Sequence, residues 1–308
     1  MTLSWQATLF NLILKLRRRR YRDLKDLHTL RKSGNGLEKL MAGKVKRTPG
    51  LASAALGGVD TDRYCAGETL DTPVAERKVL LLLHGGAYCL HSPNLYRLLL
   101  AELCARLGAE GYAPNYRLAP EHPHPAGIDD CQALYQDLLA SGYRPQHIAL
   151  VGDSAGGGLA LSLMQRARDS GLPLPCCAAL LSPAGDWSLS GASFYLNDGL
   201  DPMFNLSSML FFRALYLAGH ASTDPEVSPL LGSFAGLPPL YLTTSSTELM
   251  RDIAVTAAAK AREAGGEATL DIAEGLCHDY PIMGFLPEGR SARNKVVEFC
   301  ATHLSKAV

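Results

Sequence analysis

From residue 78 onward the chain alternates between short apolar runs and longer helical segments, and this alternation constrains the fold most. The apolar runs predict buried strands at 78–83, 147–151, 176–181, 240–244 and 269–273, with a weaker strand before Tyr116. Helical patterns lie between or after these runs, at 95–107, 129–139, 155–168, 253–264 and 295–304. Strands that alternate with helices are typical of a mostly parallel central sheet flanked by helices. We therefore expect an α/β fold.

Two stretches do not follow this alternation, namely residues 1–50 and 184–236. The second contains the aromatic residues Phe204, Phe211, Phe212 and Tyr216. An insertion of this size in an α/β domain is commonly a lid over the carboxyl ends of the strands, and a helical excursion that only covers core surface is the alternative. We expect an N-terminal helical cap segment at 1–50 and a catalytic domain at 51–308 with a cap insertion at about 184–236.

The first 22 residues are an apolar stretch followed by basic residues. A signal peptide has the opposite order, and the stretch is shorter than the roughly 20 apolar residues that a spanning helix needs. Its apolar residues suit one face of a helix that packs on protein or, as the alternative, lies on a membrane surface: Leu3, Leu9, Phe10, Ile13, Leu14 and Leu16. We favour packing and expect no stable membrane insertion.

The overall charge and the cysteines narrow the class of protein. The 30 basic and 30 acidic residues cancel, which argues against nucleic acid binding. The eight cysteines contain no C-x-x-C pair, as expected of reduced thiols in a cytoplasmic protein. No motif implies a cofactor, and a metal site at His122 and His124, which flank a proline, is not expected.

A candidate nucleophile lies in the sequence Gly-Asp-Ser-Ala-Gly at 152–156, which matches G-x-S-x-G. The motif stands between a predicted strand and a predicted helix, which is the context that it requires. There a sharp turn exposes the serine hydroxyl, and the helix N-terminus favours developing negative charge. Ser154 is therefore the expected nucleophile.

A candidate oxyanion hole lies directly after the strand at 78–83, in the sequence His-Gly-Gly-Ala at 84–87. Backbone N–H groups at such a position stabilise the oxyanion that forms when a carbonyl is attacked. We expect Gly85 and Gly86 to donate to the oxyanion, together with Ala155 beside the nucleophile.

A serine nucleophile needs a histidine base and a carboxylate that orients it, and in this fold they follow the serine in the order acid, then histidine. His278 lies in a short loop after the strand at 269–273, whereas His220 and His303 are expected at the surface. Glu248 is the first acid after the strand at 240–244. Asp252 enters the next helix, where an acid is stabilising for local reasons, and it remains the rival to Glu248.

Together these motifs resemble the hormone-sensitive-lipase-like, or bacterial family IV, esterases of the α/β-hydrolase superfamily. The segment 84–87 is similar to the family's H-G-G-G loop, 116–123 matches Y-R-L-A-P-E-H-P, and 152–157 matches G-D-S-A-G-G. Three departures stand out: Ala87 replaces a glycine, Glu248 stands where the family has aspartate, and Asp279 follows the histidine where the family has glycine. The resemblance implies an α/β-hydrolase fold with a helical cap.

The resemblance also implies a serine esterase that acts on a small-molecule ester with a short or medium acyl chain. The same machinery accepts lactones and amides, so a lactone or amide hydrolase is the alternative. A non-catalytic ligand-binding receptor is a second alternative, although the presence of His278 argues against it. A lipase at a membrane surface is a third. Many family members pair through a sheet edge, so the resemblance allows a homodimer.

Overall fold

The computed structural model describes residues 3–18 and 24–305 and contains one eight-stranded sheet within them. The strand order is β1-β2-β4-β3-β5-β6-β7-β8, antiparallel from β1 to β4 and parallel from there on. The strands are β1 (Leu51–Leu56), β2 (Val59–Tyr64), β3 (Val79–Leu83), β4 (Glu110–Pro114), β5 (Ile148–Asp153), β6 (Cys177–Leu181), β7 (Leu240–Ser245) and β8 (Ala268–Ala273). The expected mostly parallel sheet is confirmed.

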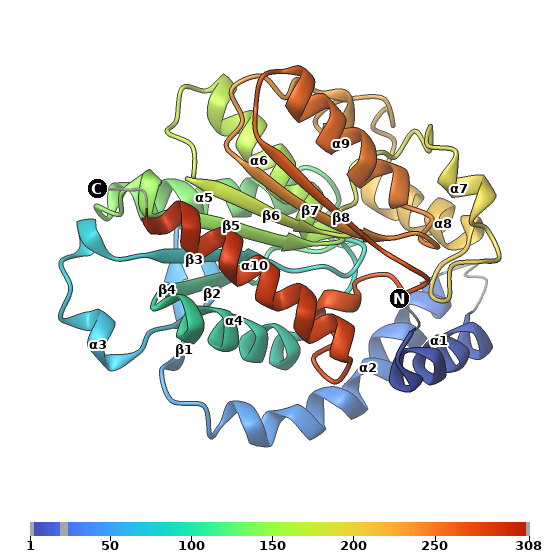
Figure 1. Ribbon diagram of the computed structural model, residues 1–308, viewed down its shortest axis with the longest axis horizontal. Coiled ribbons are helices and arrows are strands. Elements are labelled where there is room, and N and C mark those ends of the chain that lie inside the picture. The colour runs from blue at the N-terminus through green and yellow to red at the C-terminus, as the bar shows by residue number, and fades with distance from the viewer. Residues whose placement is uncertain (1–2, 19–23, 306–308) are drawn as a thin grey trace.

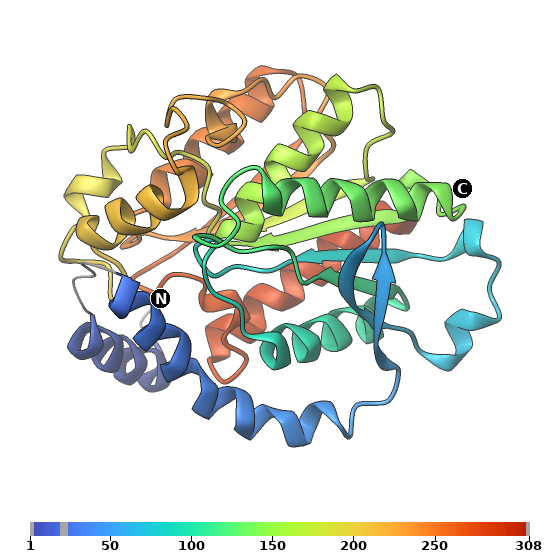
Figure 2. The same ribbon diagram turned by 180° about the vertical axis from the view of Figure 1, so that it is seen from behind.

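Helices cover both faces of this sheet. Those of the main domain are α3 (Gly67–Leu70), α4 (Pro93–Leu107), α5 (Ala126–Ala140), α6 (Ala155–Asp169), α9 (Arg251–Glu263) and α10 (Pro287–Ser305). Helices α4 and α10 lie on the face that is turned to the viewer in Figure 1, and α5 and α6 lie on the opposite face, which Figure 2 shows. The helices expected from periodicity are confirmed within a few residues, except that α10 begins eight residues earlier than the prediction.

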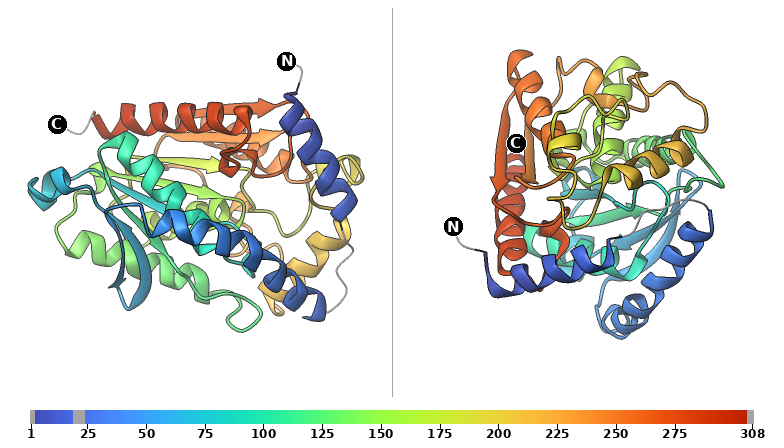
Figure 3. Two further views of the ribbon diagram at one scale, coloured as in Figure 1. Left: turned by 90° about the horizontal axis from the view of Figure 1, so that it is seen from below. Right: turned by 90° about the vertical axis from the view of Figure 1, so that its right-hand side faces the viewer.

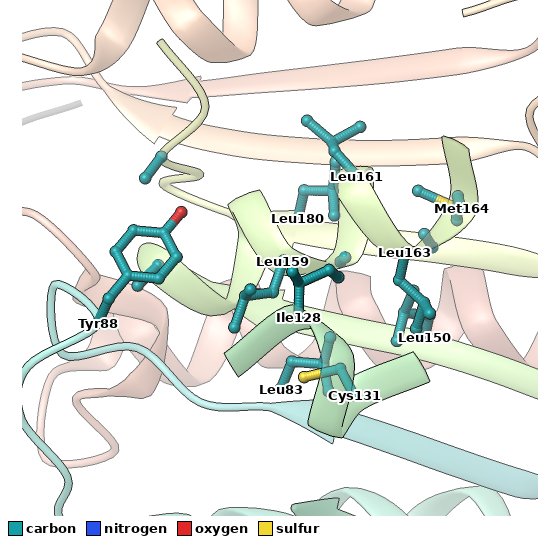
Figure 4. Close-up of a cluster of buried hydrophobic side chains, with 14 of the residues drawn as sticks. Leu83, Tyr88, Ile128, Cys131, Leu150, Leu159, Leu161, Leu163, Met164 and Leu180 are labelled. Atoms are coloured by element: carbon teal, nitrogen blue, oxygen red, sulfur yellow. The ribbon is translucent and has the colours of Figure 1, made fainter. Parts of the chain in front are cut away.

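The two cores follow from the alternation of side chains along each strand. In β3, Leu80 and Leu82 pack with α4 and α10, whereas Val79, Leu81 and Leu83 pack with α5 and α6. All five residues are fully buried, as expected for a central parallel strand covered on both faces. Figure 4 shows part of the second core, where Ile128 and Cys131 of α5 meet leucines of the sheet and of α6.

The hairpin of β1 and β2 was not predicted. Its signal is Gly57-Gly58, a two-residue loop in which both residues have positive φ (57° and 76°), as the tight hairpin turns require. A Cβ at Gly57 would overlap the backbone of α5. Strand β1 is half exposed and its apolar residues are mostly alanine, so its periodicity is weak.

The N-terminal residues form two helices, α1 (Trp5–Arg17) and α2 (Leu24–Val45). Helix α1 packs on protein through Ala7, Phe10 and Leu14, and Leu3 just before it joins them in a cluster that includes Leu276 and Tyr280. The prediction that all its apolar residues share one face is wrong, because Leu9, Ile13 and Leu16 point away from this cluster and are exposed. In the described part of the chain, no helix combines the length and the apolar character that crossing a bilayer demands.

The insertion between β6 and β7 contains two helices, α7 (Ser193–Leu196) and α8 (Leu206–Leu217). These helices lie with α1 and the start of α2 at one end of the sheet, as Figures 1 and 3 show from three directions. Two stretches far apart in the sequence therefore meet beside the loops that follow β3, β5 and β7.

Candidate active site

Ser154 lies on a sharp turn between β5 and α6. Its backbone has φ 48° and ψ −118°, a strained conformation for a residue with a side chain. The turn requires glycine on both sides, because a Cβ at Gly152 would overlap the carbonyl of Gly156 and a Cβ at Gly156 would overlap the carbonyl oxygen of Leu83. The sequence thus forces the serine hydroxyl out at the end of the sheet.

The structure brings Ser154, His278 and Glu248 together. Nε2 of His278 lies 2.9 Å from Oγ of Ser154, and Nδ1 of the same ring lies 2.7 Å from Oε2 of Glu248. All three side chains are buried, and they come from the loops after β5, β7 and β8. A serine hydroxyl, a base and an orienting acid are therefore arranged in one hydrogen-bonded chain.

Glu248 is held by further contacts, whereas the rival acid lies elsewhere. Oε1 of Glu248 accepts hydrogen bonds from Oγ of Ser182 at 2.8 Å and from the backbone N–H of Ser245 at 2.6 Å. Asp252 instead accepts the backbone N–H of Ser193 and pairs with Arg251, so it ties the insertion to α9. This geometry favours Glu248 over Asp252 as the orienting acid.

The loop after β3 presents its backbone differently from the prediction. The N–H of Gly85 already donates to Oη of Tyr96 at 2.9 Å and to Oδ1 of Asp153 at 3.1 Å. The expectation that Gly85 donates to an oxyanion is contradicted, because its N–H points to these two side chains. In the described structure the N–H groups of Gly86 and Ala87 have no acceptor, and Ala155 is the first residue of α6, whose N–H has no intrahelical acceptor.

Aromatic rings stack against His84 at the start of the loop at 84–87. The ring of His84 stacks between His91 and Tyr116, with centroids 4.0 Å away on each side. Oη of Tyr116 donates to the carbonyl of His84 at 2.7 Å, and burial lowers the pKa of His84 far below its usual value. His84 is therefore a neutral spacer that shapes the loop. The role of Tyr116 was not predicted, and its place at the start of the 116–123 motif was the available signal.

Two charged residues of the 116–123 motif form ion pairs with other parts of the chain. Arg117 pairs with Asp130 of α5 at 2.7 Å. Glu121 pairs with Arg31 of α2 through two hydrogen bonds of 2.6 and 2.9 Å. The second pair fastens α2 to the main domain.

Carboxyl groups dominate the electrostatics around His278. Burial strongly disfavours a charge on its ring, but Asp279 and Glu248 together hold the pKa of His278 well above its usual value. Burial also raises the pKa of Asp153 and of Asp279. The charge of Asp279 adds to the raised pKa of Asp153, and the charge of Glu248 adds to that of Asp279, whereas His278 opposes both shifts. Burial likewise raises the pKa of Asp201 of the insertion, whose carboxyl accepts a hydrogen bond from the backbone N–H of Leu249.

A cavity of about 250 Å³ lies over Ser154 and His278. Its apolar wall comes from four parts of the chain: Leu30 of α2, Leu90 between β3 and α4, Phe204 and Phe212 of the insertion, and Ile282 after the histidine loop. The ring of Phe204 meets His278 edge-on with centroids 5.0 Å apart. A second hollow, between α1, α2 and the insertion, shares Leu30 and Met203 with this cavity and so lies next to it.

The chain is similar to known proteins in sequence and in structure. Residues 80–282 match a protein family described by the alpha/beta hydrolase fold. An acetyl-hydrolase from Streptomyces hygroscopicus is 36% identical over 240 residues, which cover 77% of this chain and 79% of the relative. An ethyl acetate hydrolase from Pseudomonas putida is 31% identical over 242 residues, which cover 76% of each chain.

Solved structures agree with this relation. A crystal structure of an esterase from the bacterial hormone-sensitive lipase family matches with a TM-score of 0.83 and 31% identity, covering 99% of this chain and 100% of that chain. A crystal structure of the protein EstE5 soaked with p-nitrophenyl butyrate matches with a TM-score of 0.85 and 30% identity, covering 98% of this chain and 99% of that chain.

Proposed function

The chain belongs to the hormone-sensitive-lipase-like esterases of the alpha/beta-hydrolase fold and is a carboxylic ester hydrolase, and from this premise we propose that Ser154, His278 and Glu248 are its catalytic triad. The observation that carries the proposal is the continuous pair of contacts, 2.9 and 2.7 Å, from the serine through the imidazole to the glutamate.

Ester hydrolysis at this triad proceeds in two steps. Oγ of Ser154 attacks the ester carbonyl while Nε2 of His278 takes the hydroxyl proton, and the imidazolium then protonates the departing alcohol. Water attacks the acyl-enzyme in the second step, with His278 again as base, and releases the acid and the free serine. Glu248 keeps the proton of the neutral ring on Nδ1, so that Nε2 faces the serine.

The oxyanion of each tetrahedral intermediate is assigned to the N–H groups of Gly86, Ala87 and Ala155. Removing one donor from such a site typically costs about two to three orders of magnitude in turnover. The bonds from Gly85 to Tyr96 and Asp153 make Gly85 a fixed point that turns the next two N–H groups toward the cavity.

The proposed substrates are small-molecule esters with short to medium acyl chains. The cavity of about 250 Å³ is at the small end for ligand pockets, and its wall is mostly apolar. The names of the acetyl-hydrolase and of the ethyl acetate hydrolase refer to short esters and agree with this size. We assign the cap role to the N-terminal helices and the insertion, since both contribute to the cavity wall.

A series of p-nitrophenyl esters from acetate to palmitate tests this function, with Ser154→Ala as the control. We expect activity to peak at short chains and to fall by at least about a thousandfold in the variant. Retained hydrolysis in Ser154→Ala would contradict the triad. A maximum at palmitate would contradict the chain-length preference, and turnover restricted to lactones or amides would replace the substrate class but keep the mechanism.

The proposal includes a homodimer that forms along β8. This strand is the last of the sheet within the described residues, so only one of its sides is paired with another strand and the other side could pair with a second copy. Light scattering after size exclusion measures the mass in solution. A monomer at all concentrations would contradict the dimer without touching the catalytic proposal.

A further inference from the structure

Asp279 contacts the nitrogen of His278 that must accept the serine proton. Its Oδ2 lies 3.1 Å from Nε2, and Oγ of Ser154 lies 2.9 Å from the same nitrogen. The backbone of Asp279 has φ 55° and ψ 28°, in the left-handed region that favours glycine and tolerates asparagine and aspartate. A carboxylate thus stands where a glycine would be free of strain, directly against the reacting nitrogen.

This carboxyl group is buried and is surrounded by other acids. Asp279 is only 7% exposed, and its Oδ1 has no partner within the part of the chain that the structure describes. The titratable groups that face the pair come from every neighbouring element: Asp153 at the end of β5, Tyr96 of α4, Glu248 after β7, Asp201 of the insertion and the adjacent Cys277. Within this group of acids, His278 is the base that they share.

The position of the protons follows from these contacts. The Nδ1–H of a neutral His278 donates to Glu248, so Nε2 carries a lone pair. An ionised oxygen 3.1 Å from a lone pair is repelled, and the contact becomes attractive only with a proton between the two atoms. That proton lies on Asp279 and is donated to Nε2, or lies on Nε2 and is donated to Asp279. Nε2 cannot accept the serine proton in either state.

We propose that Asp279 is a positioning residue that keeps one additional proton on the His278–Asp279 pair, so that the esterase becomes fully active only when this proton leaves at alkaline pH. This inference rests on the proposed triad. The raised pKa of His278, in which burial is opposed by Asp279 and Glu248, agrees with the contacts.

The contact between Asp279 and His278 also affects catalysis at alkaline pH, after the additional proton has left the pair. The imidazolium forms in each transition state, and the negative charge of Asp279 stabilises it. Removal of Asp279 is therefore expected to raise kcat/KM at low pH and to lower it at high pH, so that the two pH profiles cross. A loss of structure would lower kcat/KM at every pH instead.

The test measures kcat/KM on p-nitrophenyl acetate across pH for the wild type, Asp279→Gly and Asp279→Asn, with Ser154→Ala as the blank. Both variants accept the left-handed backbone, and asparagine keeps the size of the side chain. Ala218→Gly is the matched control, because Ala218 has φ 47° at the end of α8, outside the catalytic contacts. In both Asp279 variants we expect the acid limb of the profile, where kcat/KM rises with pH, to lie about 1 to 3 pH units lower than in the wild type. We expect no such shift in Ala218→Gly.

Acid limbs that coincide in the wild type and both Asp279 variants would overturn the inference. A measurement that needs no activity separates this failure from failure of the triad. An NMR titration of the His278 ring in Ser154→Ala is compared with that in Ser154→Ala/Asp279→Gly, and the ring should lose its proton at lower pH in the double variant. Equal titration midpoints would also overturn the inference, whether or not the wild type hydrolyses esters.

A separate observation concerns α1, which has two apolar faces where a surface helix needs one. The inner face packs on the main domain through Ala7, Phe10 and Leu14. The outer face consists of residues at helical spacing with large exposed fractions: Trp5 72%, Leu9 49%, Leu12 55% and Leu16 79%. Within residues 3–18 and 24–305, these four side chains remain largely exposed.

The basic residues near the outer stripe indicate which kind of surface it contacts. Lys15 and Arg17 are exposed at the C-terminal end of α1, and the sequence continues with four further arginines up to residue 22. The whole chain has no net charge, so this basic run is a local feature. A tryptophan, leucines and a basic end on one short helix are typical of helices that lie in the plane of an anionic lipid surface.

Helix α1, which carries the stripe, lies next to the insertion and to the hollow beside the cavity. The Arg18 guanidinium donates to the carbonyls of Asp201 at 2.9 Å and Phe204 at 3.4 Å, which ties the end of α1 to the cap insertion. The exposed Leu200 immediately precedes Asp201. A surface that covers α1 would therefore also face the hollow between α1, α2 and the insertion.

We infer that the outer face of α1 docks on bilayers that contain anionic phospholipid. The test is co-sedimentation with phosphatidylcholine vesicles that contain or lack phosphatidylglycerol. We expect binding only to the anionic vesicles, a blue shift of Trp5 fluorescence on binding, and at least a tenfold loss of binding in Leu12→Glu/Leu16→Glu. Leu40→Glu is the matched control, since Leu40 of α2 is equally exposed at 78% and should bind normally.

Two results would overturn the docking inference. One is the absence of binding to anionic vesicles. The other is a change from dimer to monomer in Leu12→Glu/Leu16→Glu, which would show that a second copy of the chain covers the stripe. Neither result bears on the ester hydrolysis or on Asp279.

Discussion

The three residues of the proposed triad and the N-terminal helices are held in very different ways. Ser154, Glu248 and His278 are buried at the ends of central strands, and several hydrogen bonds restrain each of them. Helices α1 and α2 are attached through one face and a few polar contacts at the edge of the main domain. The comparison teaches that the central strands fix the positions of the proposed triad, whereas the positions of α1 and α2 depend on a few contacts that single substitutions can remove.

Both regions nevertheless share one cavity. Leu30 of α2 lines the same space as Ser154 and His278. Changes in the sheet loops should therefore act on turnover, and changes in the N-terminal helices should act on substrate binding.

The largest expected effect is that of Glu248→Ala. Loss of the acid leaves the ring of His278 free to adopt the wrong tautomer, so kcat should fall by about a thousandfold to ten thousandfold. Asp252→Ala is the matched control, because it removes the contacts with Ser193 and Arg251 and should mainly reduce stability. Steady-state kinetics and thermal unfolding of both variants test this assignment. A large loss of kcat in Asp252→Ala, with only a loss of stability in Glu248→Ala, would make Asp252 the orienting acid.

The next effect is expected for Tyr96→Phe. Its hydroxyl accepts a hydrogen bond from the N–H of Gly85 and donates one to Oδ2 of Asp153 at 2.6 Å. Its loss therefore leaves a buried carboxyl without this donor and loosens the loop at 84–87, which is proposed to bind the oxyanion. We expect kcat to fall about tenfold and stability to fall by about 1 to 3 kcal/mol.

Tyr135→Phe is the control for this substitution. Its hydroxyl donates to the carbonyl of Pro173 at 2.7 Å, outside the cavity wall, so the variant should lose stability but keep its kcat. If Tyr96→Phe also kept the kcat of the wild type, the loop geometry would not depend on Tyr96.

A smaller effect, of a different kind, is expected for Arg31→Ala. Arg31 joins α2 to Glu121 and to the carbonyls of Cys89 and Ala119. Because the pair is partly exposed, stability should fall by only about 1 kcal/mol, but the displaced Leu30 should raise KM while kcat stays nearly constant. Arg166→Ala breaks comparable surface pairs with Asp129 and Glu226 and should leave KM unchanged. Equal KM values for the two variants would remove α2 from substrate binding.

The smallest effect is the pH dependence of the same attachment. The hydrogen bonds with Arg31 lower the pKa of Glu121 from 4.5 to about 2. A carboxyl whose pKa is lowered on folding stabilises the protein above the unfolded pKa and loses this contribution as pH falls through the folded value. The difference in Tm between the wild type and Glu121→Gln should therefore be largest above about pH 5 and shrink toward pH 2. A difference independent of pH would contradict the pairing.

Much of the fold and most of the site could be predicted from the sequence, because they depend on local patterns. Uninterrupted apolar runs such as 79–83 can only be buried strands in this setting, and the glycines around Ser154 are required by the turn itself. The order of serine, acid and histidine follows from the order of the strand ends. The hairpin of β1 and β2 was missed because its strands have weak periodicity, although Gly57-Gly58 is a direct turn signal.

Other features were decided only by the tertiary structure. The sequence places an oxyanion loop at 84–87, but the N–H of Gly85 is turned away by Tyr96 and Asp153, which are 11 and 68 residues distant. The contact of Asp279 with Nε2 and the division of α1 into an inner and an outer face likewise depend on neighbours from other elements. Strands, turns and motif order follow from spacing along the chain, whereas the direction of an N–H and the partner of a carboxylate follow from how distant helices pack against the sheet.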